Sequence, residues 1–263
     1  MNGSTSFHSA SESTLIRDML SRIAGHPTRH WETRPSLGGM PTAPPPSQPD
    51  RTAARPTRIP DLQPGRSRTT ERLVLRPWRD EDAEAFGSLN ADPEVMTYFP
   101  APLDRAASDE LLGRARTHVD DHGWGFWALE ERSTGAFIGL TGLSQPSFEA
   151  AFTPCVEIGW RLVRSAWGQG YATEAAIAAL DVGFNELGLQ EIVSFTPSVN
   201  LRSRAVMQRI GMRHALADDF DHPLIDPANE LCHHVLYRIS RDDDHSGGPD
   251  DQVVPVCPGP VGD

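Results

Sequence analysis

Lysine is absent from this chain of 263 residues, and all 24 of its basic residues are arginine. That absence excludes several large classes of enzyme. A phosphate-binding P-loop uses a lysine on the phosphates, a protein kinase needs a lysine on one of its strands, and pyridoxal enzymes form a Schiff base with a lysine. The chemistry of this protein therefore depends on other groups.

Cysteines and long apolar runs are also scarce. The three cysteines, Cys155, Cys232 and Cys257, are too few and too widely spaced for a zinc knuckle, a redox pair or a disulfide framework. No apolar run approaches the roughly 18 residues of a membrane span. The N-terminus lacks the charged region and apolar stretch of a secretory signal. We expect a cytoplasmic protein with no metal site and no membrane association.

Positive charge is concentrated in the first quarter of the chain, although the formal net charge is −12. Residues 1–68 hold nine arginines against five acidic residues, whereas residues 69–241 hold fifteen against twenty-five. Phosphate backbones are bound by clustered positive charge. The acidic main body therefore predicts that the protein does not bind nucleic acid.

Three regions differ in composition. Residues 1–68 contain ten of the 23 prolines and few aromatic residues, so they bury too little surface to offset their chain entropy. We expect a disordered N-terminal arm there. Residues 242–263 hold six acidic residues and no basic one, which predicts a disordered tail. Residues 69–241 are expected to form one folded domain.

Helices and strands alternate within that domain, which indicates an α/β fold with a mixed sheet. A strand, a helix and a strand between residues 156 and 196 predict a crossover that joins parallel strands. The expected strands are 72–76, 124–129, 137–143, 156–163, 191–196 and 231–239, and the expected helices are 80–89, 108–119, 170–187 and 200–210, with a further short one beginning at 93–96.

A glycine-containing loop between a strand and a long helix carries the clearest functional signal. Gly168 and Gly170 allow close approach of a ligand to the backbone, and the helix that follows offers unpaired N–H groups and its positive dipole end. This pattern suits a pyrophosphate, although an ordinary helix start has the same spacing. Thr173 stands where a dinucleotide fingerprint has its third glycine, which argues against a nucleotide-binding oxidoreductase.

The strand before the loop is polar on one face. Glu157, Gly159 and Arg161 alternate with apolar residues, whereas a central parallel strand is normally apolar on both faces. The polar face predicts a strand that looks into a cleft, and an edge strand with a solvated face is the alternative.

Several ordered motifs resemble the GNAT superfamily of acetyl-CoA-dependent N-acetyltransferases, and in particular the group of ribosomal-protein alanine N-acetyltransferases. The resemblance implies the GNAT fold, a twisted mixed sheet with helices on both faces and a strand–glycine loop–helix cofactor site. The motifs are Thr70–Pro77, Gly135–Gly139, Glu157–Leu162, Trp167–Ala175, Asn200–Ser203 and Gly211–Met212.

The resemblance also implies a role for individual residues in binding acetyl-CoA. The strand end would pair its backbone with the pantetheine arm, the loop would hold the pyrophosphate, and Asn200 would reach the pantetheine arm. Asn200 is equally well explained as a helix N-cap. The residues concerned are Leu162, Val163 and Arg164 at the strand end, and Gly168, Gln169, Gly170, Tyr171, Ala172 and Thr173 in the loop.

Two positions depart from the family pattern. Ser165 stands where many members have Gln or Arg, and Met207 stands where many have the tyrosine that protonates the leaving thiolate. Ser203 is the nearest hydroxyl on the same predicted helix, so we consider it a catalytic candidate, with a capping role as the alternative.

The expected reaction is transfer of an acetyl group from acetyl-CoA to a primary amine by direct attack. The acceptor is a protein N-terminus or a small-molecule amine, and Glu157 is the candidate general base. His118 and His122 have the spacing of helical metal ligands but lack a third ligand. The alternative to an enzyme is a non-catalytic acyl-CoA-binding or regulatory module on the same fold.

Overall fold

The computed structural model describes residues 59–244, and the expected arm over 1–58 and tail over 245–263 lie outside the described residues. Residues 59–68, which the composition assigns to the arm, are described and pack on the domain. Leu62 donates its backbone N–H to the carbonyl of His122 at 2.6 Å, and Ile59 and Leu62 contact the core. The ordered domain thus begins before residue 69, because these two side chains contribute apolar surface to it.

One nine-stranded mixed sheet forms the centre of the described domain, with the order β1-β2-β3-β4-β5-β6-β9-β7 and β8 paired to β9. Neighbouring strands are antiparallel except β5 and β6, which are parallel, as the crossover pattern predicts. The strands are β1 (Arg68–Thr69), β2 (Leu73–Arg76), β3 (Phe126–Glu131), β4 (Phe137–Ser144), β5 (Glu157–Leu162), β6 (Glu191–Pro197), β7 (Arg213–His214), β8 (Phe220–Asp221) and β9 (His233–Ser240).

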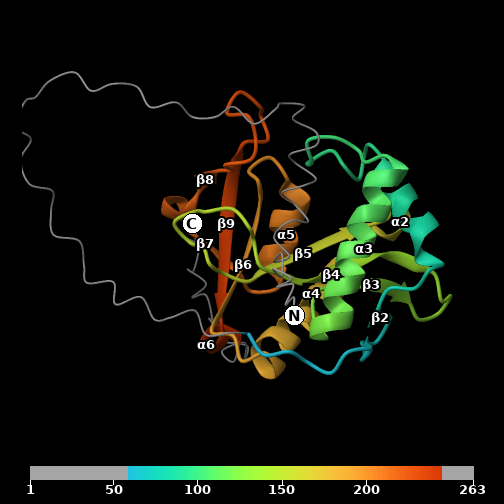
Figure 1. Cartoon of the computed structure of the whole chain (residues 1–263). Coiled ribbons are helices and arrows are strands. Elements are labelled where there is room, and N and C mark those ends of the chain that lie inside the picture. The colour runs from blue at the N-terminus through green and yellow to red at the C-terminus, as the bar shows by residue number, and fades with distance from the viewer. Residues whose placement is uncertain (1–58, 245–263) are drawn as a thin grey trace, which may run out of the picture.

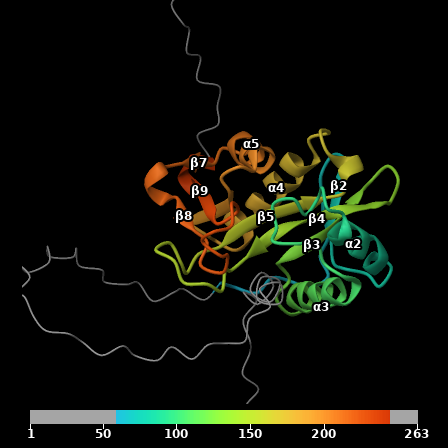
Figure 2. The same cartoon turned by 90° about the horizontal axis from the view of Figure 1, so that it is seen from above.

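Helices cover both faces of the sheet. The two views show α2 and α3 on one side of the strands and α4 and α5 on the other (Figures 1 and 2). The α-helices are α2 (Asp82–Ala91), α3 (Arg105–His122), α4 (Tyr171–Asp181), α5 (Leu201–Arg209) and α6 (Arg241–Asp244), with shorter turns η1 (Arg164–Ala166), η2 (Val182–Glu186) and η3 (Leu216–Asp218).

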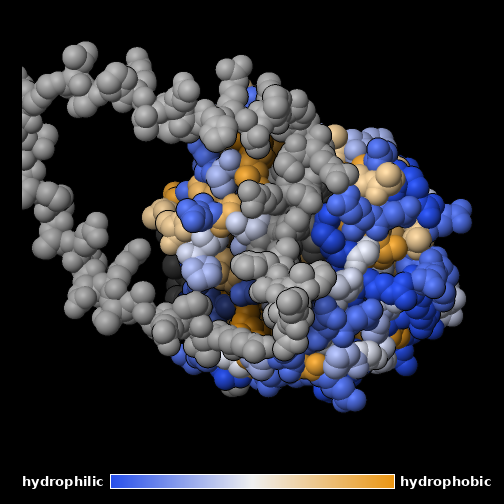
Figure 3. All heavy atoms as spheres, in the orientation of Figure 1, coloured by the Kyte–Doolittle hydropathy of each residue, from blue (hydrophilic) through white to orange (hydrophobic). Residues whose placement is uncertain are grey.

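Local signals in the sequence define the ends of α3. The Asp104 side chain caps the helix by accepting a hydrogen bond from the N–H of Ala107, and Gly123 ends it in the left-handed conformation with φ 74°. Its buried residues include Leu112, Ala115 and Val119, and the outward side of α2 and α3 is mostly hydrophilic (Figure 3). This helix is therefore longer than the expected 108–119.

Small residues form one stripe along α4 and are buried against the sheet. Ala175, Ala176 and Ala179 are fully buried against the sheet. At Gly183 an added Cβ would lie 2.5 Å from the side chain of Ile192. Small side chains thus allow the helix to approach the strands closely, which positions its N-terminus beside β5.

Two expected helices differ from the structure. Residues 93–96 form turns rather than the start of a helix. The expected helix 170–187 is α-helical only to Asp181 and continues as the π-helical turn η2, in which Leu187 donates its N–H to the carbonyl of Val182. The wider turn carries the chain to Gly188, where φ is 71°.

Strands β5 and β6 separate after their first contact. The registered pair is Glu157 opposite Val193, with the N–H of Val193 donating to the carbonyl of Val156 at 2.9 Å. β6 then follows β9 from Glu191 to Pro197, while β5 stays with β4. The divergence opens the middle of the sheet, and the candidate site lies at this opening.

Candidate active site

A cavity of about 1,070 Å³ lies at the divergence of β5 and β6. Its lining includes the glycine loop, the start of α5, the segment between α2 and α3, and both diverging strands. Most of the predicted site residues meet there: Glu157, Leu162, Gly168, Gly170, Tyr171, Ala172, Thr173, Asn200 and Ser203 line the cavity, whereas Val163, Arg164 and Gln169 do not. Residues distant in the sequence thus form one site.

The loop before α4 presents a series of unpaired backbone donors. In the described part of the chain, the N–H groups of residues 168–173 have no hydrogen-bond acceptor, and the first paired amide of the helix is that of Glu174, which bonds to Gly170 at 3.0 Å. Unpaired amides at a helix N-terminus bind anions, aided by the helix dipole. The loop is therefore equipped to hold phosphate groups.

Side chains around the loop fix its conformation. Arg72 donates from Nη1 to the carbonyl of Gln169 at 2.9 Å and forms an ion pair with Glu174 at 2.6 Å. The hydroxyl of Tyr171 donates to Glu131 at 2.7 Å, and this bond lowers the pKa of Glu131. The phenol of Tyr171 is thus used to attach α4 to β3. Arg72 belongs to the motif Thr70–Pro77, and the structure adds its role as an anchor of the loop.

The two loop glycines are required for their backbone conformation. Gly168 has φ 74° and Gly170 has φ 81°, a region that side chains rarely adopt. A Cβ at Gly168 would contact no described atom within 4 Å, and one at Gly170 would lie 3.5 Å from the Arg72 guanidinium. The space above the loop is therefore open to a ligand.

The free edge of β5 begins at Trp160, two residues before Leu162, where the resemblance places the start of the pantetheine contact. The N–H of Val163 donates to the carbonyl of Ile138, and the carbonyl of Leu162 accepts from the indole of Trp167 at 2.9 Å. Because hydrogen-bonded pairs alternate along an antiparallel ladder, the peptide groups of Trp160 and the N–H of Leu162 point toward β6. Trp160 is thus the residue whose whole peptide edge is open to the cavity, which the motif match did not single out.

The Arg164 side chain is occupied by ion pairs. Its Nε contacts Asp92 at 2.8 Å, and its Nη1 contacts Glu94. These carboxylates follow α2, on the other side of the cavity from α4. Arg164 therefore ties the turn after β5 to the segment between α2 and α3. Desolvation acts to raise the pKa of Asp92, but backbone hydrogen bonds and the charge of Arg164 together lower it.

Asn200 is the N-cap of α5. Its Oδ1 accepts from the N–H of Ser203 at 3.2 Å, and its Nδ2 donates to Thr196 Oγ1 at 2.9 Å and to Ser203 Oγ at 3.1 Å. The capping interpretation of Asn200 is thus confirmed. Ser203 lies half-buried in the first turn of α5, with its hydroxyl still able to donate.

Glu157 is buried at the start of β5 and faces the cavity. Its Oε2 has no hydrogen-bond partner among residues 59–244, while the carboxyl group is hydrogen-bonded by Ser144. Burial raises the pKa of Glu157 to about 8, and the bond from Ser144 opposes that rise. A carboxyl group that titrates near neutral pH is suited to proton transfer.

Aromatic rings and two histidines enclose the end of the cavity beside β6 and β9. His222 and His234 lie 5.0 Å apart between ring centroids, and Phe195 packs against both. Burial lowers the pKa of each histidine to about 4, so both are neutral at physiological pH. No local signal in the sequence indicates this pair, because His222 follows β8 and His234 lies in β9, and they meet only in the fold.

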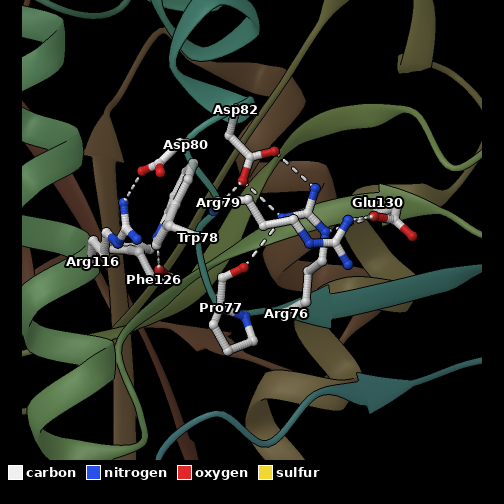
Figure 4. Close-up of polar contacts among 9 residues, drawn as sticks. All are labelled: Arg76, Pro77, Trp78, Arg79, Asp80, Asp82, Arg116, Phe126 and Glu130. Carbon is white, nitrogen blue, oxygen red and sulfur yellow. Dashed lines mark hydrogen bonds and ion pairs between the residues drawn. The ribbon is translucent and has the colours of Figure 1, made fainter.

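A buried arginine cluster supports the opposite wall. The guanidinium of Arg76 binds both carboxylate oxygens of Asp82 at 2.8 Å and Glu130 at 2.6 Å (Figure 4). Next to it, the indole N–H of Trp78 donates to the carbonyl of Phe126 at 2.7 Å. This network fixes the two aromatic residues, Trp78 and Phe126, that line the cavity.

Within residues 59–244, no group of three metal-ligating side chains is present, and no helix is long and apolar enough to cross a membrane. His118 and His122 pack ring against ring, with centroids 4.4 Å apart. Cys155 and Cys232 are free thiols, and burial raises the pKa of Cys155 to about 12.

The described domain combines a diverging parallel strand pair with a glycine loop and a helix N-terminus around one cavity. The sequence model of the acetyltransferase (GNAT) domain matches residues 72–213. This chain belongs to the GNAT acetyltransferase family, as the motifs predicted, and so to a family of enzymes that use acetyl-CoA.

Related proteins agree with this assignment. The uncharacterized protein YkkB of Bacillus subtilis is 35% identical over 147 residues, covering 56% of this chain and 84% of YkkB. The FsC-acetyl coenzyme A-N(2)-transacetylase of Aspergillus fumigatus is 33% identical over 185 residues, covering 66% of this chain and 76% of that enzyme. The Mycobacterium smegmatis RimJ structure, in complex with CoA-disulfide, shares the fold with a TM-score of 0.52 and 21% identity over 65% of this chain and 82% of RimJ.

Proposed function

We propose that this protein transfers the acetyl group of acetyl-CoA to a weakly basic primary amine, such as a protein N-terminus or a small-molecule amine, with Glu157 as the general base. The observation that carries the proposal is the position of Glu157. It lies in the same cavity as the unpaired loop amides, with one carboxylate oxygen unpartnered among the described residues.

The proposed cofactor path runs from the loop to the opening in the sheet. The amides of residues 168–173 would hold the pyrophosphate of acetyl-CoA, and the free peptide edge of Trp160 would pair with the pantetheine arm. Trp160 and all of these loop residues except Gln169 line one cavity. A backbone donor at this edge would also polarise the thioester carbonyl, as an oxyanion hole does.

The proposed reaction is a direct attack. The amine nitrogen forms a bond to the acetyl carbon, the carbon–sulfur bond breaks, and the sulfur leaves as the thiolate. Glu157 accepts the proton that the amine loses, and the thiolate of CoA is protonated on release. Ser203, whose hydroxyl is free to donate, is the proposed source of that proton, since buried Met207 occupies the position of the family tyrosine.

The pKa of Glu157 favours one class of acceptor. An α-amine has a pKa near 7.8, close to the value of about 8 that burial gives Glu157, so proton transfer between them is nearly balanced. A lysine amine, with a pKa near 10.4, costs about 4.6 kcal/mol to neutralise at pH 7, against about 1 kcal/mol for the α-amine. We therefore place α-amines and weakly basic small amines ahead of lysine side chains as acceptors. The scarcity of cysteine supports a cytoplasmic location for the reaction.

The experiment pairs binding with turnover. Thermal shift with acetyl-CoA, longer acyl-CoAs, NAD and ATP should give stabilisation by the acyl-CoAs alone, because a ligand at about 100 times its Kd adds roughly 2.7 kcal/mol. CoA release should then accompany acetylation of peptides with free N-termini and of small amines. Binding without turnover across that panel would favour a regulatory acyl-CoA-binding module instead.

A further inference from the structure

Arg161 is the charged side chain of the cavity that the proposed reaction leaves unexplained. It lies on the same face of β5 as Glu157, lines the cavity, and is half-buried. Its Nη1 donates to Asn90 Oδ1 at 2.5 Å, and its guanidinium lies 4.1 Å above the ring of Phe99. Both contacts hold the group in one orientation.

One edge of this guanidinium is unused. Among residues 59–244 its Nε is buried without a partner, and Nη2 makes no hydrogen bond. Among the described residues no carboxylate forms an ion pair with Arg161, and burial lowers its pKa to about 10. Removing a charged donor from water without giving it an acceptor is costly, which favours a partner for this edge.

A comparison within the molecule shows how this fold treats a buried arginine that has only a structural role. Arg76 uses Nε, Nη1 and Nη2 on the carboxylates of Asp82 and Glu130. Arg161 has instead an amide and an aromatic ring, which orient a guanidinium without neutralising it. The Nε–Nη2 edge has the fork geometry that binds a carboxylate through two parallel hydrogen bonds.

We infer that the acceptor amine carries a carboxylate, which Arg161 binds while the amine lies at Glu157. This inference rests on the proposed function and narrows its substrate class. Residues 157 and 161 are four positions apart, so their Cα atoms are about 13 Å apart at a rise of about 3.3 Å per residue. The two groups of the acceptor are therefore separated by several bonds, as the ends of a short peptide are.

The test compares short peptides that differ in one charge. Alanine-glycine peptides of two to five residues are supplied to the full-length protein as free acids and as C-terminal amides, and acetylation is measured as kcat/KM. The free acids should be preferred by about 10- to 100-fold, the range of a charge-assisted hydrogen-bonded pair. The preference should be greatest at about three or four residues, where the peptide spans the distance between the two side chains.

Three variants assign the preference to this side chain. Arg161→Gln should lower kcat/KM for the acids to that of the amides while turnover of the amides persists. Asn90→Asp, which supplies an internal carboxylate to Arg161, should have the same effect with the arginine retained. Arg161→Lys should keep a reduced preference, because a lysine has the charge without the fork.

The outcomes separate the two proposals. Equal turnover of acids and amides by the unaltered protein would overturn the carboxylate inference and leave the acetyltransferase proposal standing. A preference that survives in Arg161→Gln would also overturn it. Absence of turnover with every amine, charged or not, would contradict the proposed function itself. Thermal shift with acetyl-CoA on each variant verifies that it is folded and binds the cofactor.

Discussion

Glu157 and Arg161 lie on one face of β5, and burial shifts the pKa of each side chain so that its neutral form is favoured. The pKa of Glu157 rises to about 8, and that of Arg161 falls to about 10. The two groups do not form an ion pair with each other. Each is thus held in a cavity with part of its bonding capacity unused, which is the arrangement expected where a substrate completes the contacts.

The buried carboxyl group predicts how stability depends on pH. The folded pKa of Glu157, about 8, is above its ordinary value of 4.5, so the native state favours the protonated form. Its contribution to stability is full below about pH 4.5 and is lost as the pH rises through 8. Glu157→Gln does not titrate, so the variant should gain stability relative to the original protein over that window, by a few kcal/mol at most, and level off above it. Urea unfolding at pH 5, 6.5 and 8.5 measures this, and a constant difference would contradict it.

Substitution of a loop glycine should lower the affinity for acetyl-CoA, and a control variant separates this effect from that of backbone strain. Gly170→Asp places bulk and negative charge beside the unpaired amides and should lower acetyl-CoA affinity at least tenfold. The control is Gly188→Asp, because Gly188 has a similar φ of 71° and open space around it but lies away from the cavity. Both changes should cost about 1–2 kcal/mol of stability, from the left-handed backbone. Normal affinity in Gly170→Asp, measured by calorimetry, would contradict the loop assignment.

Breaking the buried ion pair of Arg76 and Asp82 should lower the stability of the protein strongly. Their side chains are 4% and 2% exposed, so Asp82→Asn leaves a buried guanidinium partly uncompensated and should cost about 3–5 kcal/mol. Asp109→Asn, in the exposed helical pair with Arg105, should cost less than about 0.5 kcal/mol. Chemical denaturation of both variants tests this, and equal losses would mean that burial of the pair is not the cause.

The contacts of residues 59–68 predict that this segment contributes to the stability of the domain. Leu62→Ala removes part of the apolar contact beside Gly123, where a Cβ would already lie 2.4 Å from the carbonyl oxygen of Leu62. We expect a loss of about 1–2 kcal/mol. Leu216→Ala, at a position that is 82% exposed, is the control and should change stability by less than about 0.5 kcal/mol. No loss in Leu62→Ala would indicate that the segment contributes little to the domain.

Periodicity and helix-end signals in the sequence predicted most elements of the fold. Strand β5 is an example, because polar and apolar residues alternate along it in the sequence. The ordering of residues 59–68 was not predictable from proline content, since it depends on contacts of Leu62 with a helix end far along the chain. The prediction of a helix beginning at 93–96 was wrong, because Asp92 and Glu94 form ion pairs with Arg164 instead.

The candidate site was predictable where it follows a local motif. The glycine loop and the polar face of β5 could be recognised from residue order alone. The neighbouring histidines, His222 and His234, and the contact of Arg161 with Asn90 could not, because each joins segments distant in the sequence. The identity of the free peptide edge at Trp160 depends on the ladder with β4, and register of that kind is set by the folded sheet.

The central claim is that Glu157 removes the proton of the amine, and the pH dependence of kcat/KM tests it most directly. With a peptide bearing a free N-terminus, kcat/KM should rise with pH and level off above about pH 8, the pKa that burial gives Glu157. The amine titrates in the same range, so the rise should reach up to about a hundredfold per pH unit where both groups are protonated. Ser144→Ala removes a hydrogen bond that lowers this pKa and should move the rise to higher pH, while Glu157→Gln should lose most of the rate at neutral pH and recover part of it at high pH. An unchanged profile in both variants would contradict the account.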